Sequence, residues 1–280
     1  MRLGAPVFVQ TQDPVELAKA HADLGYGAAY CPRPVMQDPS DGAIKAFREA
    51  FAKANIVIAE VGAWCNPMTP VEAERKKNLQ LIIDRLSIAD RIGARCCVDY
   101  AGSYSAEHSA GPHPNDLSKE AFDLVVENTR KIIDAVKPTN TTFTLEMMQW
   151  MWPDSPDAYL DLMKAVDRKA FAVHLDPTNL INSPRRYYYT GDMIRECIEK
   201  LGPKIMSAHA KDVIMAEKHL VHIDETPPGT GRLDYRAYIT GLARLPQDVP
   251  LMVEHLKGPE AYADAVKHIR GVAKECGVKL

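Results

Sequence analysis

Eight short apolar runs alternate with longer amphipathic segments, and this alternation constrains the fold more than any other feature of the chain. Most runs are nearly continuous in Val, Ile, Leu, Ala and Cys, which is typical of parallel strands covered on both faces. They cover residues 2–8, 26–32, 55–64, 94–102, 141–148, 170–179, 205–213 and 249–256. We therefore expect eight buried, parallel strands.

The intervening segments carry signals for helix ends. Asp13 suits an N-cap before Pro14, which suits the first helical position. Thr69 and Pro70 are expected to open the longest helix, with Glu72 completing a capping box. Helices are expected over residues 13–24, 41–53, 69–92, 118–136, 155–165, 191–200, 234–244 and 259–275, and left-handed glycines past helix ends at Gly25, Gly93, Gly202 and Gly277.

Eight strand–helix units in 280 residues predict an α/β fold, a single (β/α)8 TIM barrel domain over residues 1–280. A doubly wound open sheet is the main alternative, but its phosphate-binding glycine motif is missing. The one close glycine pair, Gly229 and Gly231, does not follow an apolar run. Long irregular stretches at 101–117, 177–190 and 214–233 follow strands, so we expect them at the face that carries active sites.

The composition excludes several classes of partner. Charged residues make up 25% of the chain and its net charge is -3, which does not favour nucleic acid or an anionic membrane surface. No apolar run approaches the roughly 18–20 residues that span a bilayer, and the N-terminal residues lack a signal-peptide pattern. The six cysteines form no CxxC pair, so we expect reduced, mostly buried thiols and a cytoplasmic location.

A polar residue ends each of the last four apolar runs: Glu146, Asp176, His209 and Glu254. Alone, each could be a helix cap, a rim residue or a packed core histidine. Together, three carboxylates at one barrel mouth would repel one another unless a cation lay between them. Three carboxylates and one imidazole suit Mn²⁺, Mg²⁺ or Co²⁺ better than a thiolate-preferring metal. The sequence predicts one divalent metal on these four residues, with Mn²⁺ as the first expectation.

The chain also resembles the sugar phosphate isomerase/epimerase superfamily, the xylose isomerase-like TIM barrels that include ketose 3-epimerases and inosose dehydratase. The resemblance covers essentially the whole chain. It rests on Glu146 in LEMM, Asp176 in LDPTN, the H-x-K-D from His209 to Asp212, the PGTGRLDY from Pro228 to Tyr235, and Glu254 in MVEHL. It implies that the four strand-end residues bind a divalent metal and that Glu146 and Glu254 also transfer the proton.

The same residues suit proton removal next to a sugar carbonyl. A metal that bridges carbonyl and hydroxyl oxygens stabilises the resulting enediolate, while one carboxylate takes the proton and a second group returns it. We therefore predict a metal-dependent isomerase or epimerase that acts on a ketose or keto-sugar. The same first step also serves a lyase, either a dehydratase or an eliminase or deglycosidase of 3-keto-glycosides, and this alternative stays open.

Two positions depart from the ketose 3-epimerase pattern and favour the lyase. That family has a substrate-binding histidine where this chain has Asn179, and an arginine where it has Met215. We expect Asn179 to take the place of that histidine in binding the substrate. Two other functional classes fit less well. A DNA-repair endonuclease would need a three-zinc site with more histidines and a basic surface. A non-catalytic sugar-binding barrel would have little reason to keep both Glu146 and Glu254.

Four further residues are candidates for substrate contact or catalysis. Lys211 shares its facing with His209 and could polarise a carbonyl or pair with a carboxylate. His113 in the loop 101–117 could act as a general acid or base, Trp64 could stack on a sugar face, and Arg185 could grip a carboxylate or phosphate. Each of the four could equally be a solvated or packing residue. The expected partner is a small carbohydrate, and the sequence leaves open whether the chain forms a homo-oligomer.

Overall fold

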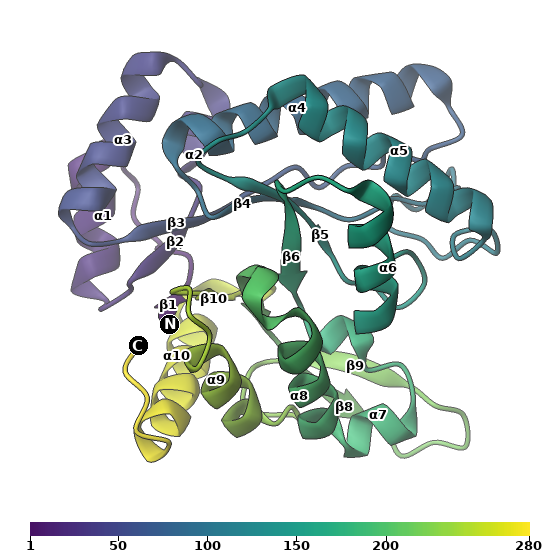
Figure 1. The fold of residues 1–280 in the computed structure, drawn as a ribbon. Helices are drawn as coiled ribbons and strands as arrows, with labels where there is room; N and C mark the ends of the chain where they lie inside the picture. Colours follow the sequence, from purple (N-terminus) through teal and green to yellow (C-terminus); the bar gives the residue numbers. More distant parts are fainter.

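The computed structural model describes residues 1–280 and confirms the closed α/β barrel (Figure 1). Eight parallel strands close in the order β1-β10-β7-β6-β5-β4-β3-β2, with β1 also pairing with β2. They are β1 (Arg2–Gly4), β2 (Ala28–Tyr30), β3 (Val57–Gly62), β4 (Cys96–Asp99), β5 (Thr142–Glu146), β6 (Phe171–Leu175), β7 (Ile205–Ala210) and β10 (Pro250–Val253). Each strand lies inside one of the eight apolar runs.

Long helices surround the strands, as Figure 1 shows. They are α1 (Pro14–Asp23), α3 (Asp41–Lys53), α4 (Glu72–Ile92), α5 (Lys119–Val136), α6 (Pro156–Val166), α8 (Thr190–Leu201), α9 (Tyr235–Ala243) and α10 (Gly258–Glu275). Shorter elements are α2 (Arg33–Gln37), α7 (Pro184–Tyr188) and the 3-10 turns η1 (Thr178–Leu180) and η2 (Gly202–Lys204). Apart from the start of α4, the long helices match their expected ranges within one residue at each end.

Side-chain caps fix most of these starts. The side chains of Asp13, Ser40, Ser118, Ser155 and Asp234 each accept a hydrogen bond from a backbone N–H in the first turn of the helix that follows. Such caps satisfy amides that have no partner inside the helix, and they depend on local sequence alone. The helix boundaries were therefore readable without knowledge of the tertiary structure.

Two expectations about helix ends were wrong. The capping box at Thr69 does not form, because α4 begins at Glu72 and its N-cap residue, Val71, makes no side-chain cap. The Thr69 hydroxyl instead accepts the N–H of Val71, in the turn that precedes the helix. Gly202 is right-handed, with φ -41°, because the chain continues directly into η2. The other three glycines have the expected positive φ.

Two buried tyrosines pin helices to the strands. The hydroxyl of Tyr159, on α6, bonds the backbone of β5 and β6. The hydroxyl of Tyr238, on α9, lies 2.9 Å from the carbonyl oxygen of His209 on β7 and 3.2 Å from that of Leu175 on β6. Both side chains are fully buried. These contacts hold three strands whose ends carry polar residues in a fixed relation to their helices.

An antiparallel hairpin outside the barrel, β8 (Asp212–Met215) and β9 (Ile223–Thr226), corrects the expectation of an irregular loop over 214–233. Asp212 closes its base. This carboxylate accepts four backbone N–H groups, from Val213, Gly229, Gly231 and Leu233. A Cβ at Gly231 would collide with the carbonyl oxygen of Val213, so this position requires glycine. The H-x-K-D segment therefore supplies the carboxylate, and the PGTGRLD segment supplies N–H groups, of the hydrogen bonds that close the hairpin.

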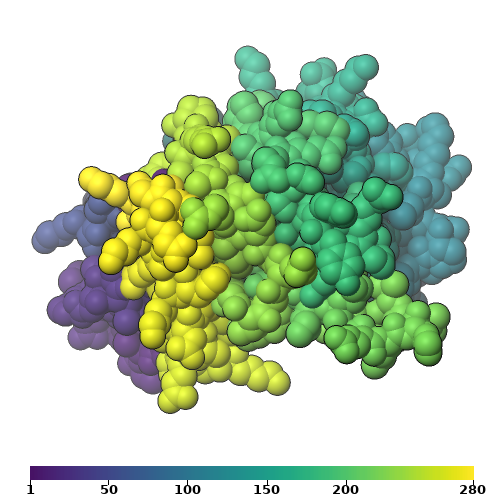
Figure 2. All heavy atoms as spheres, turned by 90° about the horizontal axis from the view of Figure 1, so that it is seen from below, coloured from purple at the N-terminus to yellow at the C-terminus, as the bar shows by residue number.

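The two ends of the chain meet where the barrel closes. Figure 2 shows α10, in yellow, beside the N-terminal residues in purple, while the light green hairpin projects from the opposite side of the view. Pairing between β1 and β10 accounts for this proximity. None of the helices combines the length and the apolar character that crossing a membrane requires.

Candidate metal centre and active site

The four strand-end residues come together at the carboxyl end of the barrel. Glu146 ends β5, Asp176 follows β6 directly, His209 lies near the end of β7 and Glu254 follows β10. These strands are consecutive in the barrel. The side chains of Asp176 and His209 are fully buried, and those of Glu146 and Glu254 are 7% and 14% exposed. The result is an enclosed cluster of three carboxylates and one imidazole.

The cluster is centred on Nδ1 of His209. This atom lies 2.8 Å from Glu254 Oε1, 3.0 Å from Glu146 Oε1 and 3.7 Å from Asp176 Oδ2. One potential ligand atom from each of the four residues lies within 4.8 Å of the others. The four groups are thus close enough to share a single cation.

The donor set fits a divalent metal. Asp176 Oδ2 and Glu254 Oε1 are buried and take part in no hydrogen bond, although basic groups lie near both. The three carboxylates share the positive charge of Lys211 and the imidazole of His209, and a divalent cation between them would balance the rest of their negative charge. Three carboxylate oxygens and one imidazole nitrogen match the preferences of Mn²⁺, Mg²⁺ and Co²⁺. The residues present therefore fit the group that their pattern implies.

Lys211 brings a positive charge to the same point. Its Nζ lies 2.7 Å from Glu254 Oε1, 2.9 Å from Asp176 Oδ2 and 3.7 Å from Glu146 Oε1. Burial alone lowers the pKa of Lys211, but these carboxylates outweigh burial and raise that pKa above its usual value. The ammonium group therefore stays charged within reach of any group bound at the cluster.

Two of the carboxylates, those of Asp176 and Glu254, stay ionised despite their burial. Burial raises the pKa of Asp176, but Lys211 and His209 together hold that pKa well below its ordinary value. Burial likewise raises the pKa of Glu254, yet His209 and Lys211 lower it to about 2. Ionised oxygens are what a metal ligand or a general base must offer.

A second polar layer lies directly beneath the cluster and was missed in the sequence. Glu60, on β3, places Oε1 3.2 Å from Nε2 of His209. Its Oε2 lies 3.0 Å from both Nε2 of His174 and the hydroxyl of Ser207. Burial raises the pKa of Glu60, but His209 and His174 hold that pKa below its ordinary value, so the group is a carboxylate. The sequence signal that could have identified Glu60 is an acidic residue in the middle of the apolar run 55–64.

Trp64 lies at the rim of the cluster. Its ring centroid is 6.2 Å from that of His209, and 42% of the side chain is exposed. The backbone of Trp64 is left-handed, with φ 47°, and its indole packs where a Cβ at Gly62 would otherwise lie. This aromatic face therefore borders both the imidazole and solvent.

His255, which the sequence did not single out, extends the cluster toward the hairpin. Its Nδ1 lies 3.0 Å from Oε2 of Glu225 on β9, and its Nε2 lies 3.6 Å from Oε2 of Glu254. The backbone is left-handed, with φ 60°, which is uncommon for a residue other than glycine. The hairpin thus contributes to the surroundings of the metal candidates through Glu225.

The remaining candidates lie at different distances from the cluster. Asn179, on η1, places its amide nitrogen 3.2 Å from Sδ of Met148, two residues beyond Glu146. His113 is half-buried in its loop, where Nδ1 accepts the N–H of Asn115. Arg185 is exposed on α7, in a surface cavity whose lining includes none of the four metal candidates. The structure therefore places Asn179 beside Met148, just past the strand that ends with Glu146, and brings neither His113 nor Arg185 into contact with the cluster.

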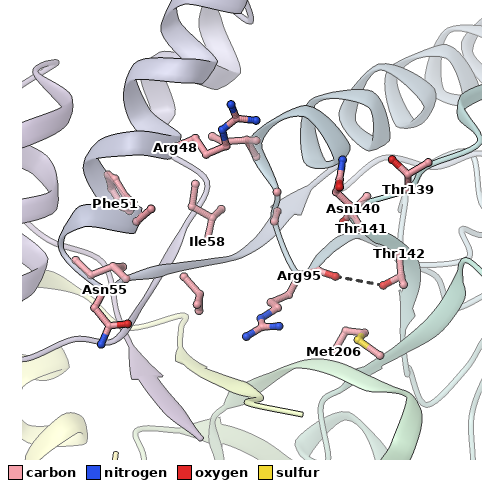
Figure 3. Close-up of a pocket in the computed structure, with 16 residues that line it drawn as sticks. Arg48, Phe51, Asn55, Ile58, Arg95, Thr139, Asn140, Thr141, Thr142 and Met206 are labelled. Atoms are coloured by element: carbon pink, nitrogen blue, oxygen red, sulfur yellow. Dashed lines mark hydrogen bonds between the residues drawn. The ribbon is translucent and has the colours of Figure 1, made fainter.

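Two cavities lie at opposite ends of the barrel strands. The one in Figure 3, about 500 Å³, lies at the amino ends of the strands and is lined by Arg48, Arg95 and Thr141, among others. It is on the face opposite the metal candidates. A cavity of about 670 Å³ follows β1 and β2, and its lining includes Tyr30. The Tyr30 hydroxyl donates to the carbonyl oxygen of Val253, so this lining residue lies beside the end of the strand that leads to Glu254.

Comparisons with known proteins agree with the fold. The family model described as xylose isomerase-like TIM barrel matches residues 18–272. No curated protein is significantly similar to the chain in sequence.

Three solved structures of the same architecture illustrate the likeness. A xylose isomerase-like TIM barrel protein from Mycobacterium smegmatis in complex with magnesium has 18% identity and a TM-score of 0.67, over 94% of this chain and 88% of that one. A 3-keto-D-glucoside 4-epimerase from E. coli has 15% identity and a TM-score of 0.69, over 97% and 99%. The probable 3-DHS dehydratase from Bacillus anthracis has 12% identity and a TM-score of 0.70, over 97% and 98%. At these identities the likeness establishes a shared fold.

Proposed function

Since the chain belongs to the xylose isomerase-like TIM barrel family, we propose that it is a divalent-metal-dependent isomerase or epimerase of a ketose or keto-sugar. The observation that carries this proposal is the convergence of three buried carboxylates on Nδ1 of His209. The metal, Mn²⁺ in our proposal, would be held by Glu146, Asp176, His209 and Glu254. When bound, it would stabilise the negative charge that develops on a substrate carbonyl oxygen.

Glu146 and Glu254 are proposed to move the proton. Their strands, β5 and β10, are separated by β6 and β7 in the barrel, so the two carboxylates approach the centre from different sides. A carbon bound between them would present opposite faces to the two groups. In an epimerisation, one carboxylate would then take the proton from one face while the acid form of the other delivers a proton to the opposite face.

Other residues of the mouth are proposed to bind and orient the substrate. The Lys211 ammonium is positioned to donate a hydrogen bond to a substrate oxygen near the three carboxylates. Trp64 offers an aromatic face above His209, and Asn179 offers an amide beside Met148. A keto-sugar substrate is supported by the structural neighbour described as a 3-keto-D-glucoside 4-epimerase.

A lyase is the second candidate function. Asn179 and Met215 stand where ketose 3-epimerases have substrate-binding residues, and one structural neighbour is described as a dehydratase. Elimination needs one carboxylate as the base and another group to protonate the departing oxygen. His113 remains our proposal for that acid and Arg185 for a contact with an anionic group, each by a movement of its loop or helix toward the mouth.

The test is proton exchange in D2O. Purified protein with added Mn²⁺ is incubated with a panel of ketoses and 3-keto-glycosides, and NMR identifies the carbon that acquires deuterium. We expect exchange next to the carbonyl, at least about a hundredfold slower in Glu146→Gln and Glu254→Gln. Glu217→Gln, an exposed carboxylate on the hairpin turn, is the matched control. Unchanged exchange in both site variants would overturn the proposal, as would wild-type protein that binds no divalent metal.

The same experiment separates the two candidate functions. An epimerase converts the substrate into its stereoisomer, whereas a lyase releases water or an aglycone that mass spectrometry detects. If the lyase is correct, His113→Ala should block release of the leaving group while sparing deuterium exchange. If the epimerase is correct, His113→Ala should affect neither.

A further inference from the structure

Glu60 lies beneath the metal candidates, where its carboxylate contacts His209, His174 and Ser207. We propose that Glu60 is the positioning residue of the metal centre: it holds His209 with the Nε2 proton toward the barrel interior, so that the Nδ1 lone pair faces the three carboxylates. This inference rests on the proposed function, because it concerns the histidine ligand of the same metal. It adds a residue from β3, a strand that contributes none of the four ligands.

The two oxygens of the Glu60 carboxylate contact different residues. Oε1 has one neighbour, Nε2 of His209, at 3.2 Å. Oε2 has two, Nε2 of His174 and the Ser207 hydroxyl, each at 3.0 Å. With three donors around it, the carboxylate is fixed in rotation, and Oε1 is left to His209 alone. The imidazole cannot turn without losing this contact.

The two ring nitrogens of His209 face different carboxylates. Nδ1 of His209 faces Glu254 and Glu146, and Nε2 faces Glu60. A neutral imidazole carries one proton, and a carboxylate without a proton of its own can only accept. With a cation held by Glu146 and Glu254, Nδ1 would offer it a lone pair, and the single proton of the neutral ring would then lie on Nε2, where Glu60 accepts it. Hydrogen bonds of this kind orient metal-bound histidines and make them better ligands.

A second metal ion is the competing explanation, because Glu60, His174 and His209 are themselves close enough to share a cation. Two observations favour hydrogen bonds. The distances of 3.0 to 3.2 Å are those of N–H and O–H donors on a carboxylate. A cation there would also require His209 to lose both protons and bridge two metals. We therefore expect one metal ion per chain.

Glu60→Gln is the informative substitution because it keeps the shape and removes the charge. If the amide oxygen faces His209, the amide N–H₂ opposes the donors of His174 and Ser207. If the amide is reversed, its N–H₂ faces Nε2 of His209 and favours the proton on Nδ1, which blocks the ligand position. Both orientations weaken metal binding, so we expect a loss of about 10- to 100-fold in affinity for Mn²⁺.

Calorimetric titration with Mn²⁺, in the absence of any sugar, measures this effect. Ser207→Ala removes one donor from Oε2 but leaves the contact between Oε1 and His209. Thr144→Val changes another fully buried polar residue, whose hydroxyl bonds the carbonyl oxygen of Cys97. Both controls should lose less than about tenfold in affinity, below the range for a histidine-orienting partner. A stoichiometry of two, or Glu60→Gln with wild-type affinity, would overturn the inference while leaving the proposed function intact.

A spectroscopic measurement on the wild-type protein covers the case in which Glu60→Gln does not fold. Nitrogen-15 NMR of the nine histidines in the Mg²⁺-loaded protein reports which ring nitrogen carries the proton. We expect His209 as the Nε2–H form, assigned by its loss in His209→Gln. Finding the proton on Nδ1 would contradict the inference. Wild-type protein that binds neither Mn²⁺ nor Mg²⁺ would remove the proposed function and this inference together.

Discussion

Replacing Tyr238 by phenylalanine should destabilise the barrel without opening a large cavity. The substitution removes only the hydroxyl, which bonds the carbonyl oxygens of Leu175 and His209 at 3.2 and 2.9 Å. A hydrogen bond contributes about 0.5–1.5 kcal/mol net, and a buried acceptor left without a partner costs about 1–3 kcal/mol. Because the ring and its packing remain, we expect a total loss of about 1–3 kcal/mol.

Equilibrium unfolding in urea, followed by circular dichroism, measures this loss in the free energy of unfolding. A thermal scan should show a parallel fall in Tm, about 2–4 °C for each kcal/mol in a chain of this size. Tyr188→Phe is the matched control, since Tyr188 is 53% exposed and a change at an exposed position has little effect on stability. If Tyr238→Phe unfolds within about 0.5 kcal/mol of both wild type and this control, the tyrosine contact does not hold the strands.

Three further predictions concern catalysis, thiols and acid stability. Glu254→Gln should lower turnover by at least about a hundredfold yet retain metal, because an amide oxygen is still a weak ligand; an active variant would contradict its role as base. All six cysteines should react with a thiol reagent in denaturant and slowly in the native protein, where none is exposed and burial raises the pKa of Cys31 to about 12. Burial lowers the pKa of His21 below 6.5, so the unfolded chain takes up a proton first as pH falls, and stability is lost from about pH 6.5 downward. His21→Leu should flatten that decline in urea unfolding between pH 5 and 8, and an unchanged slope would exclude His21 as its source.

The fold was readable from the sequence because its signals are local. Buried strands appear as apolar runs, and residues such as Ser118 and Ser155 mark helix starts by capping them. The four metal candidates were found for a related reason. Each ends an apolar run, and the parallel arrangement places all strand ends at one mouth.

Features that depend on packing between distant strands could not be found in this way. Glu60 lies between the apolar residues Ala59 and Val61, and its partners His174 and Ser207 belong to β6 and β7, more than 100 residues away. Which inward side chains meet is set by the stagger of the closed barrel, which no local pattern encodes. The hairpin escaped notice because β9 is largely exposed on both faces and shows no alternation between buried and exposed residues.

The four hydrogen bonds on Asp212 have a consequence for how a chain of this kind can diversify. They bind both ends of the hairpin segment to one carboxylate. The ends therefore keep their positions on the barrel whatever the length of the segment between them. Each doubling in the length of such a loop costs only about 0.6 kcal/mol in closure entropy. Insertions or grafts near Leu220, which is 75% exposed, would therefore lengthen the wall beside Glu225 and His255 while leaving the strands below unchanged. Recombination in this hairpin could therefore alter which molecules reach the metal candidates without changing the strands that carry them.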